Sequence, residues 1–491
     1  MKYRRTLAAA GAGALVAVLI WSGHSFAVSG KPVAGAASAA GQKPNPNCVA
    51  MPSDRSTDNK TLLDPMPADL SLGLPCTENA QFSGPAGSTP QDNLQRGFDF
   101  YSWITFLALN APDGGSPITA ATPNTRAKWE NIGNFRQLAD VMLPHGAKPL
   151  PWGQPSPPPP ECKAQFKSGM TIIHRIEEAF NQPFKSGPLI DQNGRFALFD
   201  ILMNKSMYDY IVQHHLYSKA FQASTAGANE TVEFPFGTTA PLAAGADMLK
   251  VSWKVIDPIK DASQKDRFHL VTALIYAPAS EDGKRKATCS GPTTLGMVGF
   301  HVVHKTVARK QWIWTTFEQV DNIPDQAQVD AQIANPNAKL IQSRYNFFDP
   351  NNLKLSANQT PPRPWDPSVE PFPNNFKSQI TRVEPVTGDV LDLNPKFLAL
   401  LGKSVWKYYA LISTQWPSDF GCAAIDSAHD RSPDPTCSPV PTNLANSTLE
   451  TFSQGTTPVA SSSCMACHNN ATTFQQPAKQ SDFTYILEKA Q

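Results

Sequence analysis

Residues 295–322 read LGMVGFHVVHKTVARKQWIWTTFEQVDN. They contain two runs rich in β-branched and aromatic residues, 296–304 and 311–320, a composition typical of β-strands. Three upstream runs of the same kind predict further strands at 194–203, 248–256 and 268–276. A helix is expected over 206–217, between the first two of these runs.

Two longer helices are expected on either side of this strand-rich region. The first runs from Asp92, which can cap it, to Asn110, because apolar residues recur near helical spacing. The second is expected to open at Asn394-Pro395 and to continue to about Ser413. The order of helix, strands and helix predicts an α+β fold with a largely antiparallel sheet flanked by helices.

The 45 prolines in 491 residues, and a stretch rich in Asn, Pro and Asp at 321–375, predict long irregular connections. Residues 28–47 show no apolar periodicity and are expected to be a linker. We therefore divide the chain into a signal peptide, a flexible and irregular segment, an α+β domain and a short, mainly helical C-terminal segment packed on that domain: 1–27, 28–87, 88–460 and 461–491.

The first 27 residues have the features of a secretory signal. A basic start precedes an apolar run at 7–20, and Ser25-Phe26-Ala27 fits a cleavage site. The alternative is an uncleaved anchor, but the run is short for a span of about 20 residues. We expect a periplasmic or secreted protein with no stable membrane span after cleavage. The balance of 42 Lys and Arg against 41 Asp and Glu argues against nucleic-acid binding.

The motif that carries chemistry is Cys464-Met465-Ala466-Cys467-His468. C-x-x-C-H is the attachment signal of c-type haem: two thiols on one turn reach two vinyl groups of one porphyrin, and the histidine supplies the proximal ligand to the iron. Chance predicts roughly 0.003 such motifs in a chain of this composition. We therefore predict one covalent haem c on Cys464 and Cys467, with His468 as its proximal ligand.

Three other interpretations of the motif compete with haem attachment. A Cys464–Cys467 disulfide would leave His468 without a role. A zinc site needs a second pair of ligands, and the nearest other cysteine, Cys437, lies 27 residues upstream. A thioredoxin-like pair would follow a strand, whereas serines precede this one.

The second axial ligand must come from upstream or be absent, because the 23 residues after His468 contain no Met and no His. The best candidates are His301 and His304, which face opposite sides of a strand, so at most one can meet the haem. The alternative is that both are structural, and Met297 is a weaker candidate. A short helix at 481–489 is expected to pack over the haem edge.

Two acids near the same strand, Glu318 and Asp321, are candidates for a catalytic pair. Acids at this position are more typical of a salt-bridged strand end. We therefore name no catalytic residue.

Several stretches resemble the exported bacterial "cytochrome c family" proteins of about this length. They are RGFDFYSWITFLALN at 96–110, the opening stretch at 295–322, Gln415-Trp416-Pro417, and 443–468. The resemblance spans about residues 90–491 and implies haem c on Cys464 and Cys467 with His468 as proximal ligand. Members often carry Glu-His where this chain has Glu318-Gln319, so the resemblance lends no support to a catalytic role there.

These observations favour a periplasmic monohaem cytochrome that transfers electrons to and from other periplasmic redox proteins. A haem-dependent oxidoreductase or gas-binding protein, with an open sixth iron site for a small-molecule ligand, is the alternative. A third possibility is an electron-entry subunit of a larger complex. The sequence thus favours an electron carrier over an enzyme.

Six of the eight cysteines remain after the motif is set aside, and six allow 15 disulfide connectivities. Export favours disulfides. Proximity in sequence favours Cys48–Cys76 and Cys422–Cys437, which leaves Cys162–Cys289 as the long-range link.

Overall fold

The computed structural model describes residues 48–54, 63–64, 70, 72–78, 90–174, 186–228, 231–279, 283, 285–363, 365, 375–386, 388–418, 438–454, 462–474 and 478–491. The predicted signal peptide and linker lie outside these residues, as does the predicted Cys422–Cys437 pair. The described residues all belong to one compact unit of the chain.

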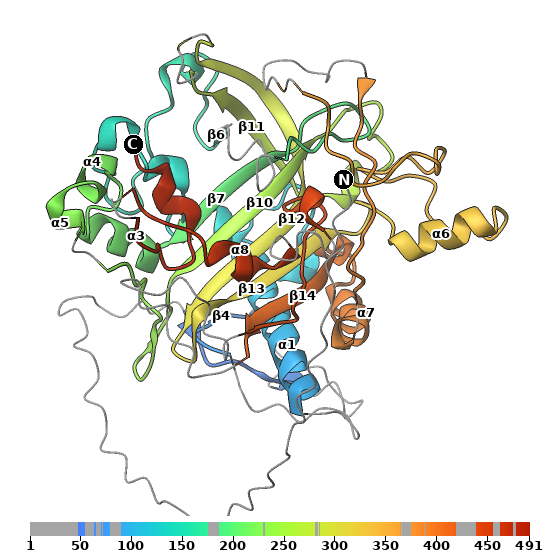
Figure 1. Ribbon diagram of the computed structural model, residues 1–491, viewed down its shortest axis with the longest axis horizontal. Coiled ribbons are helices and arrows are strands. Elements are labelled where there is room, and N and C mark those ends of the chain that lie inside the picture. The colour runs from blue at the N-terminus through green and yellow to red at the C-terminus, as the bar shows by residue number, and fades with distance from the viewer. Residues whose placement is uncertain are drawn as a thin grey trace, which may run out of the picture. The chain divides into compact units, whose positions relative to one another are not determined.

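Nine strands of the described chain form one sheet (Figure 1). Seven lie in the order β15, β14, β13, β12, β10, β7, β5, while β11 pairs with β12 and β6 pairs with β11. Every pair is antiparallel except β6 with β11. The predicted α+β class with a largely antiparallel sheet is therefore confirmed. The strands are β5 Phe135–Gln137, β6 Thr171–His174, β7 Leu198–Asn204, β10 Asp247–Val255, β11 Leu270–Ala277, β12 Thr288–Thr306, β13 Arg309–Gln319, β14 Tyr409–Pro417 and β15 Pro439–Val440.

All five predicted strands are present, as β7, β10, β11, β12 and β13. The predicted helices at 92–110 and 206–217 correspond to α1, Pro90–Asn110, and α3, Lys205–Gln213. β12 is longer than predicted, because its first half pairs with β11 and its second half with β10 and β13.

The predicted helix from Asn394 to about Ser413 is wrong at both ends. The helix α7 spans Asp389–Leu401 and ends at Gly402, whose φ of +57° suits glycine. Asn394 does not cap it: its Oδ1 accepts a hydrogen bond from Trp103 Nε1 (3.0 Å) and its Nδ2 donates one to Leu411 O (2.9 Å). The residues that follow, rich in Tyr, Ile, Thr and Trp, form the strand β14 instead.

The stretch at 321–375, predicted as loops, contains a helix, α6, over Gln326–Ala334. Asp325 and Gln328 form a capping box there, a signal the composition of the stretch obscured. The remaining elements are short: β1 Cys48–Val49, β2 Ser53–Asp54, β3 Leu63–Asp64, β4 Leu74–Pro75, α4 Lys219–Gln222, α5 Thr225–Ala228, β8 Thr238–Thr239 and β9 Leu242–Ala243.

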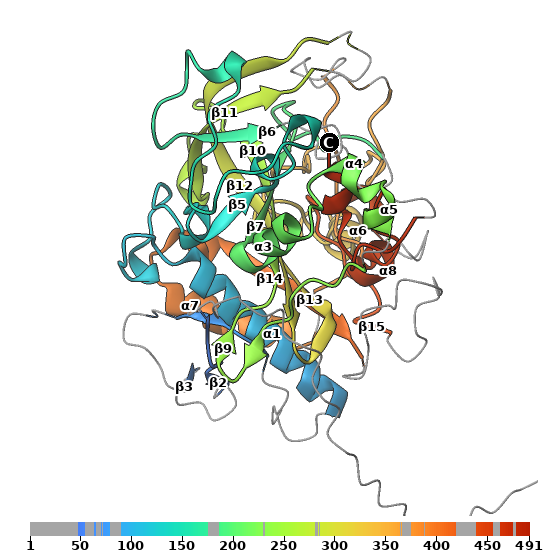
Figure 2. The same cartoon turned by 90° about the vertical axis from the view of Figure 1, so that its left-hand side faces the viewer.

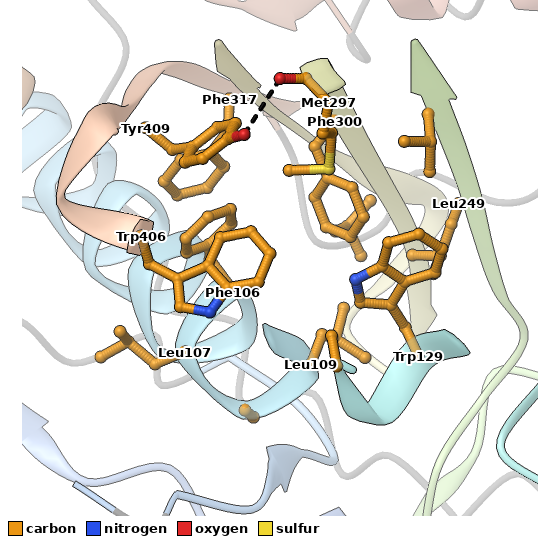
Figure 3. Packing of buried hydrophobic residues seen from close by; sticks show 14 of the residues in the cluster. Phe106, Leu107, Leu109, Trp129, Leu249, Met297, Phe300, Phe317, Trp406 and Tyr409 are labelled. Carbon is orange, nitrogen blue, oxygen red and sulfur yellow. Dashed lines mark hydrogen bonds between the residues drawn. The ribbon is translucent and has the colours of Figure 1, made fainter. Parts of the chain in front are cut away.

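The main core lies on the face of the sheet covered by α1 and α7. The Phe106 ring on α1 stacks on Phe317 of β13, with ring centres 4.1 Å apart, and Trp103 stacks on Phe397 of α7 at 4.8 Å. Figure 3 shows this packing, with Tyr409 donating a hydrogen bond to the Met297 carbonyl (3.0 Å). The aromatic side chains of α1 therefore cover one face of the sheet. The other face is available to the C-terminal segment.

Two predicted disulfides are confirmed, Cys48–Cys76 and Cys162–Cys289. The first joins β1 to the residue after β4. The second joins the start of β12 to the segment before β6, and so ties together the β6–β11–β12 part of the sheet.

Candidate functional site

The cysteine-histidine turn is the helix α8, Cys464–His468, which packs against β13 and β14 on the face opposite α1 (Figures 1 and 2). Ser463 caps it by accepting a hydrogen bond from Ala466 N (3.3 Å). Gln415 of β14 accepts hydrogen bonds from Met465 N (2.9 Å) and from Ser463 Oγ (3.2 Å). Buried Met465 packs among apolar side chains that include Trp314 and Val303. The turn is therefore held on the sheet by both polar and apolar contacts.

Cys464 and Cys467 are free and half-buried, and both lie on this single turn. Burial raises the pKa of both thiols, that of Cys464 most strongly. They are therefore protonated at neutral pH and are not joined to each other. Tyr485 donates a hydrogen bond to the Cys467 carbonyl (2.9 Å), which links the turn to the chain's last residues.

His468 is oriented through its Nδ1 atom, which lies 2.7 Å from the Phe483 carbonyl oxygen. A carbonyl can only accept, so Nδ1 carries the proton and Nε2 keeps the lone pair. The ring lies beside Trp314 and Tyr485, with ring centres 4.5 and 5.2 Å away. Burial lowers the pKa of His468 to about 4, so the imidazole is neutral at pH 7.

The carbonyl that orients His468 is itself fixed by the core. Asp482 and Phe483 both have positive φ, 52° and 62°. The buried Asp482 carboxylate pairs with Lys305 of β12, and the Asp482 carbonyl accepts a hydrogen bond from Trp312 (3.1 Å). The predicted helix at 481–489 is therefore a shorter 3₁₀ turn, Tyr485–Lys489, because this bend precedes it.

His301 and His304 lie on opposite faces of β12, as the strand geometry predicted. His304 faces α1 and is hydrogen-bonded through Nδ1 to the Tyr101 hydroxyl, and burial lowers its pKa to about 3. His301 lies on the face that carries α8, and its Nε2 is 3.1 and 3.0 Å from the two carboxylate oxygens of Glu450. Of these two candidates, the structure brings only His301 to the side of the cysteine-histidine turn. Met297 packs in the core on the α1 face.

Glu318 and Asp321 are held in ion pairs with arginines. Glu318 forms two hydrogen bonds with Arg382 (3.1 and 2.7 Å), and Asp321 forms two with Arg267 (2.5 and 2.7 Å). These contacts fit the structural role expected from the sequence.

The sequence analysis assigned no role at the site to four residues that surround the turn: Gln415, Glu450, Lys250 and Phe483. Lys250 stands inside the apolar run MLKVSWKVI at 248–256, and a charge within a strand so apolar was a signal that could have been used. Phe483 contacts His468 through its backbone carbonyl, and a pattern of side chains in the sequence cannot predict such a contact.

No protein-family model, curated protein or solved structure matches this chain. Within the described ranges, no helix is long and apolar enough to cross a membrane. The same residues show no group of three or more His, Cys, Asp or Glu side chains arranged to hold a metal ion.

The residues present fit a covalently bound haem. Two unpaired thiols lie on one helical turn, and the adjoining imidazole has its Nδ1 proton on a carbonyl, the arrangement that fixes Nε2 for a metal. Cys464 and Cys467 would hold the porphyrin and His468 the iron.

The His301–Glu450 pair gives a pH prediction. Burial alone would raise the pKa of Glu450, but the His301 charge and hydrogen bond lower it from 4.5 to about 2. The pair therefore stabilises the fold fully above pH 4.5, and this contribution is lost as the pH falls towards 2. At neutral pH we expect Glu450→Gln to lower the unfolding free energy by about 1 to 3 kcal/mol.

The measurement is urea unfolding at a series of pH values. Between pH 4.5 and 2 the wild type should lose stability more steeply than Glu450→Gln. Glu161→Gln, at an exposed carboxylate, is the matched control and should follow the wild type. Parallel curves for the wild type and Glu450→Gln would contradict the assignment.

Proposed function

We propose that this chain is an exported monohaem c-type cytochrome that transfers electrons between periplasmic redox proteins. The observation that carries the proposal is the Nδ1 contact of His468 with the Phe483 carbonyl, 2.7 Å, beside two free thiols on the same turn. It leaves the Nε2 lone pair for the iron. Bound haem c supplies a one-electron redox couple.

The protein's own residues contribute position and exposure. Gln415 and Met465 hold the turn on the sheet, while Trp314 and Tyr485 flank the imidazole. Because Cys464, Cys467 and His468 are only half-buried, a partner can approach the haem edge. The two disulfides suit an oxidising compartment and so support export.

The test is a pyridine haemochrome spectrum of the purified chain, followed by a redox titration. We expect a c-type band and a reversible one-electron transition. A spectrum without a c-type band would refute the proposal.

A second candidate is a haem-dependent oxidoreductase or gas-binding protein with an open sixth site. It is favoured by one observation: Nε2 of His301, the nitrogen that would ligate iron, is engaged by Glu450. Carbon monoxide added to the reduced protein separates the two. No Soret shift supports a six-coordinate carrier, and a large shift supports the second candidate.

A further inference from the structure

Three charged side chains face the cysteine-histidine turn from the sheet and the segment beside it. Lys250 of β10 and His301 of β12 are direct neighbours in the strand register, and Glu450 lies against His301. The next register pair on the same face of these strands, Met248 and Val303, belongs to the apolar cluster on which the turn packs. The three charges also act electrostatically on His468. They therefore adjoin the proposed haem site.

The position of Glu450 is fixed by the segment that contains it. Asn446 N donates a hydrogen bond to Glu450 Oε2 (3.1 Å), and Asn446 Nδ2 donates to Thr316 Oγ1 (2.8 Å) on β13. Gly299 allows this close approach, because a Cβ there would lie 2.2 Å from Thr448 Oγ1. Glu450 is therefore held against His301 by the fold.

His301 is placed as a cation by its two partners. The Glu450 carboxylate can only accept, so Nε2 carries a proton, and Nδ1 lies 3.4 Å from the Thr315 carbonyl, which also only accepts. Both ring nitrogens thus face acceptors, which suits the imidazolium form. His301 and Glu450 neutralise each other.

The charge of Lys250 lowers the pKa of Glu450 less than the charge of His301 does, so His301 is the main partner of that carboxylate. Lys250 is half-buried, and its ammonium lies 5.6 Å from the centre of the Phe199 ring. Among the described side chains, no carboxylate lies within ion-pair distance of Lys250. The Lys250 ammonium is partly removed from water, and the His301–Glu450 pair beside it is already neutral. Its positive charge therefore favours the binding of an anion.

We propose that Lys250, next to the His301–Glu450 pair, forms a binding site for a carboxylate beside the cysteine-histidine turn. A carboxylate accepts charge-assisted hydrogen bonds from an ammonium and brings the cluster to neutrality. It has two possible sources, a dissolved carboxylate or a propionate side chain of haem c. The second source rests on the proposed function, and the first does not.

The experiment measures the thermal unfolding midpoint of the haem-loaded chain over increasing formate at constant ionic strength. If the source is a dissolved carboxylate, formate raises the midpoint of the wild type, and Lys250→Met weakens the apparent affinity at least tenfold. The matched control is Lys310→Met on β13, which removes another half-buried strand lysine that lies over an aromatic ring (Phe236, 5.1 Å). It should behave as the wild type.

If a haem propionate fills the site, formate leaves the haem-loaded wild type unchanged. The haem-free Cys464→Ser/Cys467→Ser variant should then respond to formate, and the same variant with Lys250→Met should not. Should the haem-free variant fail to fold, the reduction potential of the haem-loaded lysine variants tests whether a propionate fills the site. Lys250→Met should make it pH-dependent between about pH 5 and 7, as an unpaired propionate titrates, and Lys310→Met should not.

The proposal is overturned if neither form responds to formate and the two lysine variants have the same potential profile, or if Lys250→Met keeps the wild-type response. The haemochrome spectrum decides the proposed function separately. A chain without haem that still binds formate through Lys250 would refute the proposed function and support the carboxylate site.

Discussion

The Cys464→Ser/Cys467→Ser variant is expected to contain no covalently bound haem. Both thiols are free and lie on one turn, so the two replacements remove both possible thioether bonds while leaving His468 in place. The serine hydroxyl groups do not form the bonds to the porphyrin vinyl groups that the cysteine thiols form. Covalent haem survives denaturing electrophoresis, so peroxidase staining of the gel should fall from a strong band to background.

The matched control is Ala466→Ser, which adds the same hydroxyl within the turn but keeps both cysteines and His468. It should stain like the wild type. Met465 and Gln415 anchor the turn, and serine is close to cysteine in size, so the double variant should fold with an unchanged far-ultraviolet circular dichroism spectrum. A stained band in the double variant would show that these cysteines do not carry the haem.

The central strands were predictable because periodicity and composition agree there. Residues 296–304 and 311–320 are buried, β-branched and aromatic, and they form β12 and β13 as expected. The second long helix was mispredicted because Asn394-Pro395 has the local chemistry of a helix start. In the structure, Asn394 lies inside α7, and its side chain forms tertiary hydrogen bonds with Trp103 and Leu411 and does not cap the helix.

The candidate site was predictable only where the residues lie together in sequence. The motif at 464–468 is local, so it could be found directly. Glu450 and Lys250 reach His301 from 149 and 51 positions away along the chain, and sequence alone gives no distance between them. The faces of His301 and His304 followed from strand alternation, but the partner on each face required the structure.

The Cys162–Cys289 disulfide is expected to contribute more to stability than any single surface contact. Its two cysteines are separated by 127 residues, a segment that includes β6, β7, β10 and β11. In the chain-entropy account, closing a loop of this length destabilises the unfolded state by about 5 kcal/mol. The Cys162→Ala/Cys289→Ala variant should therefore lose about that much unfolding free energy in urea under non-oxidising conditions.

The second confirmed disulfide provides the matched control. Cys48 and Cys76 are separated by 28 residues, for which the same account gives about 3.5 kcal/mol. Cys162→Ala/Cys289→Ala also removes a covalent link beside the β6–β11 pair, where buried Ile172 and Leu274 pack around Cys162. The long-range variant should therefore be both less stable and cleaved first by protease in this part of the sheet. If the short-range variant lost more stability, loop entropy would not be the main contribution of these disulfides.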